Sequence, residues 1–198
     1  MRTLFALLSA LAATPVLAAA PLAATAQTAA TPPATLVAHA GADAVLGFAS
    51  SYDGEAFEGR FARFEARIAF DPATASGRFD VVIDLASAGT ENDERDEVLL
   101  GPEFFDVGVL PQARYEATRF RKLADGRFVA EGTLQLRGVS QPVPLTFTWT
   151  AGATPVLEGE ASVPRLAFGV GAGRDWRDTG LMPDAVTVRT RLRLQPAP

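Results

Sequence analysis

Carboxylate side chains gather between residues 91 and 106, the stretch of the sequence whose composition is closest to that of an acid–base site. Five of them surround Arg95, namely Glu91, Asp93, Glu94, Asp96 and Glu97. Neighbouring carboxylates can act as a general acid and base or bind calcium, but the ligand spacing and central glycine of an EF-hand loop are missing. Acids at the start of a short helix also complement its dipole. We therefore interpret the stretch as structural, with catalysis by its carboxylates as the alternative.

Other chemistry has little support in the sequence. His39 is the only histidine and cysteine is absent, so a histidine pair or thiolates for zinc are not available. No G-x-S-x-G motif marks a nucleophile. The GVGAG stretch at 169–173 resembles part of a dinucleotide loop, but a polar segment ended by proline follows it where that loop needs a helix. The sequence predicts no catalytic residue, no metal site and no cofactor other than a bound lipid.

The N-terminus has the pattern of a secretory signal peptide. Arg2 precedes a short apolar run at 4–13, and small residues suited to cleavage follow, up to Ala18 and again up to Ala26. We expect a signal peptide over 1–26 and a disordered leader over 27–34. The apolar run is too short for a transmembrane helix, and without cysteine the chain has no site for a lipid anchor. The prediction is a soluble protein of the periplasm.

Charge narrows the choice of partner. The formal net charge is -5 at pH 7 and no basic run is present. An acidic chain of this kind is a poor candidate for binding nucleic acid or an anionic membrane surface. We expect an uncharged or apolar partner and no nucleic acid.

Alternation of apolar and polar residues at period two is the main pattern after residue 34. It predicts strands over 63–70, 79–85, 128–136, 143–149, 157–163 and 186–194, with weaker strands over 35–38, 44–50 and 115–120. A helical pattern is confined to about 92–100. Short strands joined by Gly, Pro, Asp and Ser turns indicate an all-β antiparallel barrel or sandwich of eight or nine strands, in a single domain over 35–196.

The direction of the apolar face is a separate question. In an outer-membrane barrel it would point to lipid, but the arginines and glutamates of the opposite face would then crowd a narrow lumen. We expect the apolar face to point inward. Small residues at mid-strand, such as Ala66, Ala130 and Gly132, either leave room for a slender ligand or fit the taper of a filled barrel. The residue pattern leaves both possibilities open.

Three segments carry a resemblance to a known family. In order they are FEGRFARFEARIAFDP, then FDVVIDLASAGTENDERDEVLLGPEFFDVGVLPQARYEATRF, then FVAEGTLQLRGVSQPVPLTF. Their sequence of F-x-G-x-F, FDP, RD-x-x-L, FFD and a G-x-L-x-L-x-G hairpin resembles the YceI-like family of secreted polyisoprenoid-binding proteins. The resemblance covers roughly residues 35 to 194.

The resemblance implies an eight-stranded, lipocalin-like antiparallel barrel with a short helical insertion, enclosing an isoprenoid such as a quinone or polyprenol. It implies that residues 95–106 close one end, with Leu99, Leu100, Phe104 and Phe105 facing inward and with Arg95 and Asp96 organising the connection. The segment 169–184 departs from the family pattern, and Trp176 there could reshape one mouth of the barrel.

Taken together, we expect a non-enzymatic carrier of an isoprenoid or other long-chain lipid. The alternatives are a secreted enzyme that uses the carboxylates of 91–106, and a filled barrel that is the partner of a membrane protein; a homodimer is also open. The expected lipid-binding residues are Phe64, Ala66, Ile68, Phe70, Val81, Ile83, Leu99, Leu100, Phe104, Phe105, Ala117, Phe128, Ala130, Gly132, Leu134, Phe147, Trp149 and Trp176.

Overall fold

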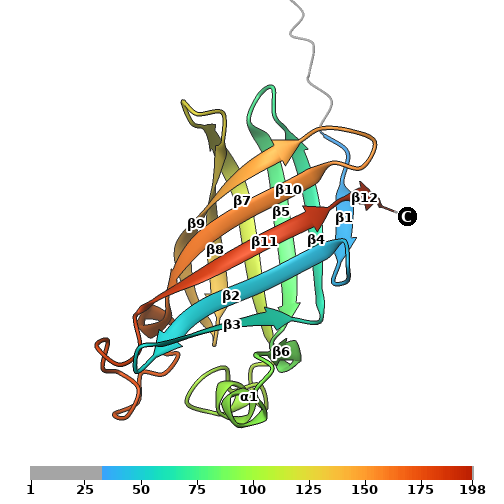
Figure 1. Cartoon of the computed structure of the whole chain (residues 1–198). Coiled ribbons are helices and arrows are strands. Elements are labelled where there is room, and N and C mark those ends of the chain that lie inside the picture. The colour runs from blue at the N-terminus through green and yellow to red at the C-terminus, as the bar shows by residue number, and fades with distance from the viewer. Residues whose placement is uncertain (1–32, 198) are drawn as a thin grey trace, which may run out of the picture. The chain divides into compact units, whose positions relative to one another are not determined.

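The computed structural model describes residues 33–197. The expected signal peptide and residues 27–32 of the expected leader lie outside the described residues. Within them, one antiparallel sheet forms most of the fold (Figure 1). No helix in 33–197 has the length and apolarity needed to cross a membrane.

Residues that alternate at period two in the sequence alternate between buried and exposed positions in the strands. The strand over 64–71 buries Phe64, Ala66, Ile68 and Phe70, whereas Arg67 between them is exposed. The strands are β1 (Leu36–His39), β2 (Ala44–Tyr52), β3 (Glu55–Phe61), β4 (Phe64–Asp71), β5 (Ser76–Asp84), β6 (Ala88–Gly89), β7 (Gln112–Lys122), β8 (Phe128–Leu136), β9 (Val139–Thr150), β10 (Val156–Pro164), β11 (Ala185–Arg193) and β12 (Gln195–Pro196). The helices are η1 (Leu85–Ser87), α1 (Asp93–Leu100) and η2 (Arg165–Phe168).

The all-β antiparallel barrel is confirmed, with more strands than expected. The order in the sheet is β12-β1-β4-β5-β7-β8-β9-β10-β11-β2-β3-β6. Elements from its two ends are consecutive in the chain, because β1 leads into β2, β3 into β4 and β11 into β12. The sheet therefore curls back on itself. β6 and β12 have two residues each. β3 lies where the alternation predicted no strand, because only Asp53 and Gly54 form the turn after β2, both at positive φ.

Charged residues lie on the outer face of the sheet. Cross-strand pairs join Arg114 to Asp80 at 2.8 Å and Arg189 to Glu160 at 2.9 Å, with the side chains partly or largely exposed. Exposed pairs of this kind stabilise a fold by only about 0–1 kcal/mol each. Their importance lies in orientation, because they keep the polar face outward and leave the apolar face to line the interior.

An aromatic cluster lies near the β4–β5, β7–β8 and β9–β10 hairpins. These hairpins are at the end of the barrel opposite α1 (Figure 1). Phe70 lies at its centre, with ring centroids 5.0 Å from Phe128 and 5.1 Å from Phe147. The other members come from neighbouring strands and complete a continuous set of edge-to-face and tilted contacts: Phe79, Phe120 and Trp149. We call these six residues the aromatic cluster. Such pairs add about 0.5–1.5 kcal/mol each beyond their burial, so this end is densely packed.

Small residues on the strands make room for neighbouring side chains. A Cβ added at Gly132 would collide with the Tyr115 ring, and one added at Gly59 would collide with the Phe48 ring. Ala66 and Ala130 are completely buried in the packed core. At Gly132 the ring of Tyr115 from the adjacent strand therefore occupies the volume that the small residue leaves.

The contact between Gly132 and Tyr115 gives a first prediction. Gly132→Ala is expected to lower the free energy of unfolding by about 1–3 kcal/mol, because the added methyl group overpacks the site. Gly108→Ala is the matched control, since nothing lies within 4 Å of a Cβ at that position. Urea denaturation of both variants measures the difference. Equal stabilities for the two variants would contradict the packing described.

Candidate functional site

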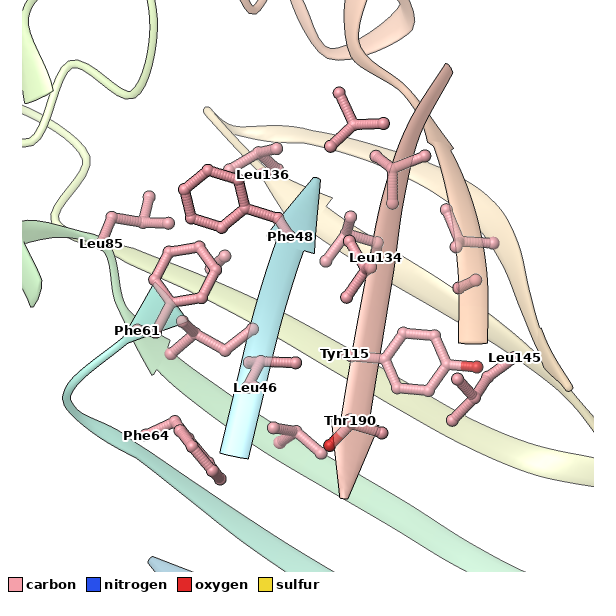
Figure 2. A pocket seen from close by; sticks show the side chains of 18 of the residues that line it. Leu46, Phe48, Phe61, Phe64, Leu85, Tyr115, Leu134, Leu136, Leu145 and Thr190 are labelled. Atoms are coloured by element: carbon pink, nitrogen blue, oxygen red, sulfur yellow. The ribbon is translucent and has the colours of Figure 1, made fainter. Parts of the chain in front are cut away.

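A cavity lies inside the barrel between the aromatic cluster and the end that carries α1. Its volume is about 170 Å³. Leu46, Leu134 and Leu145 project into it from different strands (Figure 2). Aliphatic side chains occupy many inward positions here, whereas aromatic rings fill the opposite end. The interior is therefore only partly filled by its own side chains.

The first part of the cap over this cavity is α1 and the loop that follows it. Asn92 caps the helix by accepting a hydrogen bond from the Arg95 backbone N–H at 2.9 Å. Asp96 accepts hydrogen bonds from the backbone N–H and the hydroxyl of Thr90, at 2.8 and 2.6 Å. These contacts fix α1 so that Leu99, followed by Phe104 and Phe105 from the loop, reaches the cavity. Asp96 thus organises the connection, in agreement with the family resemblance.

Arg95 contacts an aromatic ring of the barrel wall. Its guanidinium lies 4.6 Å from the centroid of the Phe57 ring, a cation–π arrangement. No ion pair within 4.0 Å involves Arg95 in the part of the chain that the structure describes. Because Phe57 belongs to β3 and also borders the cavity, Arg95 joins the helix to the wall.

The second part of the cap is the segment between β10 and β11, held by Arg165. This side chain is 1% exposed and donates five hydrogen bonds of 2.7–3.1 Å to backbone carbonyls. Five is the full donor capacity of a guanidinium. The acceptors are the carbonyl oxygens of Val170, Gly171, Trp176, Met182 and Pro183. Arg165 therefore satisfies backbone groups that the loop would otherwise bury without partners.

The two parts of the cap are joined to each other. The Gly171 N–H donates to the Glu103 carbonyl at 2.8 Å. Arg137, from the turn after β8, donates to the carbonyls of Pro102 and Phe104. Trp176 packs against the Phe104 ring at 5.1 Å between centroids. This end of the barrel is therefore closed by a connected set of contacts.

The expected lipid-binding residues divide into two groups. Those that border the cavity are Phe64, Ile68, Val81, Ile83, Leu99, Phe104, Phe105 and Leu134. Those that lie elsewhere are Phe70, Phe128, Phe147 and Trp149 in the aromatic cluster, Ala66, Ala117, Ala130 and Gly132 in the packed core, Leu100 packed against the core, and Trp176 packed against the Phe104 ring. An inward position was therefore not sufficient to place a residue at the cavity.

Sequence reasoning missed the wall formed by β2, β10 and β11. Inward residues there border the cavity, among them Leu46, Leu157, Val186, Val188 and Leu192. Their strands show the same alternation, so extending the inward face along 44–52, 156–164 and 185–193 would have found them. Arg165 gave no such signal, because a lone arginine after a strand resembles any surface residue.

Few polar groups reach the cavity. The Tyr115 hydroxyl donates to the Ala130 carbonyl at 3.3 Å, and the Thr190 hydroxyl donates to the Val45 carbonyl at 3.1 Å. Figure 2 shows both side chains among the leucines of the wall. Burial raises the pKa of Tyr115 well above its ordinary value and outweighs the lowering by the Leu145 and Gly132 backbone. The Tyr115 phenol is therefore neutral at physiological pH.

The carboxylates of 91–106 lie outside the cavity. Glu91, Asp93, Glu94 and Glu97 are exposed, and none of the described residues that border the cavity is acidic. His39 is exposed on β1. Within 33–197 no group of three or more His, Cys, Asp or Glu side chains is placed to hold a metal ion. The acid–base alternative thus has no pair of groups facing the apolar interior.

Comparison with known proteins gives a consistent family match. The model of the YceI-like domain matches residues 38–194. A UPF0312 protein of Yersinia enterocolitica is 39% identical over 88 residues, which are 44% of this chain and 45% of the relative. A UPF0312 protein of Vibrio parahaemolyticus is 29% identical over 61% of this chain and 65% of the relative. The matched region thus spans between about half and two thirds of these relatives.

Solved structures share the fold. Burkholderia cenocepacia BcnA superposes with a TM-score of 0.71 and 28% identity, over 76% of this chain and 94% of that protein. A polyisoprenoid binding domain from Saccharophagus degradans, implicated in plant cell wall breakdown, has a TM-score of 0.62 and 18% identity, over 81% of this chain and 98% of that domain. At that identity the second likeness concerns the fold alone.

The environment of Tyr115 predicts a pH effect. Because the folded pKa is raised above the ordinary value of 10.0, the neutral phenol stabilises the fold below pH 10, and this contribution is lost as the pH rises toward the folded pKa. Tyr115→Phe is expected to cost about 0.5–1.5 kcal/mol at pH 7 and to lose less stability than the parent above pH 10. Urea denaturation of both proteins between pH 7 and above pH 10 tests this prediction. Equal losses of stability in the parent and the variant would contradict a raised pKa for Tyr115.

The role of Arg165 predicts a large effect of its removal. Arg165→Met is expected to lower the free energy of unfolding by more than about 3 kcal/mol and to expose 169–184 to protease, because several buried carbonyls lose their donor. Arg137→Met is the control, because Arg137 donates to the Pro102 and Phe104 carbonyls in the first part of the cap and not to the segment that Arg165 holds, so it should have a smaller effect. If Arg165→Met is as stable and protease-resistant as the parent, the hydrogen bonds of Arg165 are not what holds the segment 169–184.

Proposed function

Since the chain belongs to the YceI-like family, we propose that it is a non-enzymatic binding protein whose barrel holds an isoprenoid or similar apolar lipid, such as a quinone or polyprenol. The observation that carries this proposal is the cavity of about 170 Å³ with an almost wholly apolar wall. The Saccharophagus neighbour, named for polyisoprenoid binding, points in the same direction.

The size of the cavity suits part of an isoprenoid chain. A cavity needs about 10–15 Å³ of free volume for each water it holds, and a methylene group is of similar size. The cavity therefore has room for roughly a dozen methylene groups, or about two to three isoprene units. Burial of one methylene stabilises a complex by about 0.8 kcal/mol, so each five-carbon unit contributes at most roughly 3–4 kcal/mol before ordering costs. A short chain could therefore bind well without any charged contact.

The shape of the site favours binding over catalysis. A hydrolase or isomerase would need a positioned acid, base or nucleophile beside its substrate. The described wall of the cavity offers apolar side chains, three hydroxyl groups and Arg165, whose donors are all engaged. The cavity also favours a carrier over a filled barrel that only contacts a membrane protein.

A carrier role in the periplasm completes the proposal. The sequence pattern of 1–26 supports export, and the acidic composition supports solubility of a protein that holds an apolar cargo. Purification from the native compartment, organic extraction and mass analysis of the extract test the proposal directly. A co-purified isoprenoid supports it. An empty protein that also fails to bind added isoprenoid would overturn it.

Blocking the cavity gives a sharper test. Ala161 borders the cavity, so Ala161→Phe is expected to fill it and to abolish lipid binding while the barrel stays folded. Ala130→Phe is the matched control, because Ala130 is completely buried and is not among the residues that border the cavity, and there the same change should destabilise the fold by about 1–3 kcal/mol or more. Native mass spectrometry and thermal unfolding measure the two effects. Lipid retention by a folded Ala161→Phe variant would place the ligand elsewhere.

A further inference from the structure

Ser50 is unusual among the polar groups of the interior. It lies on β2 and borders the cavity, and its Oγ is shielded from solvent without a hydrogen-bond partner. No other side-chain nitrogen or oxygen in residues 33–197 is buried in this state. Buried hydroxyl groups in folded proteins almost always have a partner. An unsatisfied hydroxyl at the wall of a cavity is therefore well placed to receive its partner from a ligand.

The remaining polar groups of the wall are already satisfied. The hydroxyls of Tyr115 and Thr190 donate to backbone carbonyls, and all five N–H groups of Arg165 do the same. A phosphate or carboxylate in the cavity would find one free hydroxyl and no free cationic donor. Burial of an unpaired charge is strongly unfavourable, so the site disfavours anions.

The place of Ser50 along the barrel sets an orientation. Ser50 pairs in register with Phe57 of β3 and lies near the end of β2, where the Asp53 N–H donates to the Leu181 carbonyl in the cap at 2.9 Å. The tip of β2 and α1 lie at the same end of the barrel (Figure 1). Ile68 and Phe79 also border the cavity, and Phe79 is a member of the aromatic cluster. A head group at Ser50 therefore directs an apolar tail from the cap toward that cluster.

Resting on the proposed function, we propose that the cavity selects isoprenoids with a neutral polar head, an alcohol or a quinone carbonyl, which hydrogen-bonds to Ser50 Oγ beneath the cap, and that it rejects isoprenoid phosphates. A serine hydroxyl can donate to a carbonyl and can both donate to and accept from an alcohol. One serine hydroxyl does not compensate for burial of the double negative charge of a phosphate head group. Head-group chemistry, and not only tail length, then decides which lipid is held.

The test uses the full mature protein freed of lipid and three probes with the same tail: farnesol, farnesyl phosphate and the hydrocarbon farnesene. Calorimetric titration of the parent is expected to show farnesyl phosphate binding at least about 100-fold more weakly than farnesol. Ser50→Ala is expected to weaken farnesol about tenfold, the effect of one ordinary hydrogen bond, and to leave farnesene unchanged. Ser51→Ala, the same change at the next residue, which does not border the cavity, should alter neither.

The outcomes separate the two proposals. Binding of neither farnesol nor farnesene overturns both the carrier function and the head-group selection. Binding of farnesol and farnesene with no change in Ser50→Ala, or with farnesyl phosphate as tight as farnesol, overturns the selection alone. Removal of an unsatisfied hydroxyl should leave the melting temperature of Ser50→Ala unchanged or raised, so a loss of farnesol affinity will not reflect unfolding.

Discussion

The volume inside a curled sheet must be filled by the side chains that point into it, and in this barrel they fill it unevenly. Six aromatic residues pack the end away from α1, with centroid distances as short as 4.8 Å between Phe79 and Phe120. Beyond them the inward side chains are largely aliphatic and leave about 170 Å³ unfilled. The site exists because the aromatic cluster ends part of the way along the barrel, so its position follows from packing and not from a polar constellation.

The cap has to satisfy buried backbone groups, because a chain that crosses the end of a barrel buries N–H and carbonyl groups that no neighbouring strand can pair. Arg165 satisfies five carbonyl groups, and Asp96 accepts from the backbone and side chain of Thr90. With the polar backbone satisfied in this way, Leu99, Phe104 and Phe105 can present only apolar surface to the cavity. The charges near the cavity thus serve the structure of the cap. This division explains how an interior with a buried arginine can still suit a neutral lipid.

Prediction from sequence worked best where the signal was local. Alternation at period two gave the inward face of β4, and a helical pattern predicted a helix over about 92–100, close to the observed Asp93–Leu100. It failed where neighbouring strands decide the outcome. Tyr115 is opposite Leu134 and Ala117 is opposite Gly132, so the Tyr115 ring leans diagonally over the glycine and fills the space its small size leaves. Register between strands is a tertiary property that the sequence of one strand does not contain.

The sequence by itself determined the all-β class and the direction of the apolar face, because both follow from residue types at short, regular spacing. Its motifs also carried the resemblance to the family that the comparisons confirm. The tertiary structure alone decided which inward residues border free volume, because Phe70 and Ile68 are equivalent in the pattern of β4 yet only Ile68 borders the cavity. It also decided that Arg165 is saturated and that Ser50 Oγ has no partner. Hydrogen-bond satisfaction depends on atoms brought together from distant segments, and for that reason no spacing in the chain could reveal it.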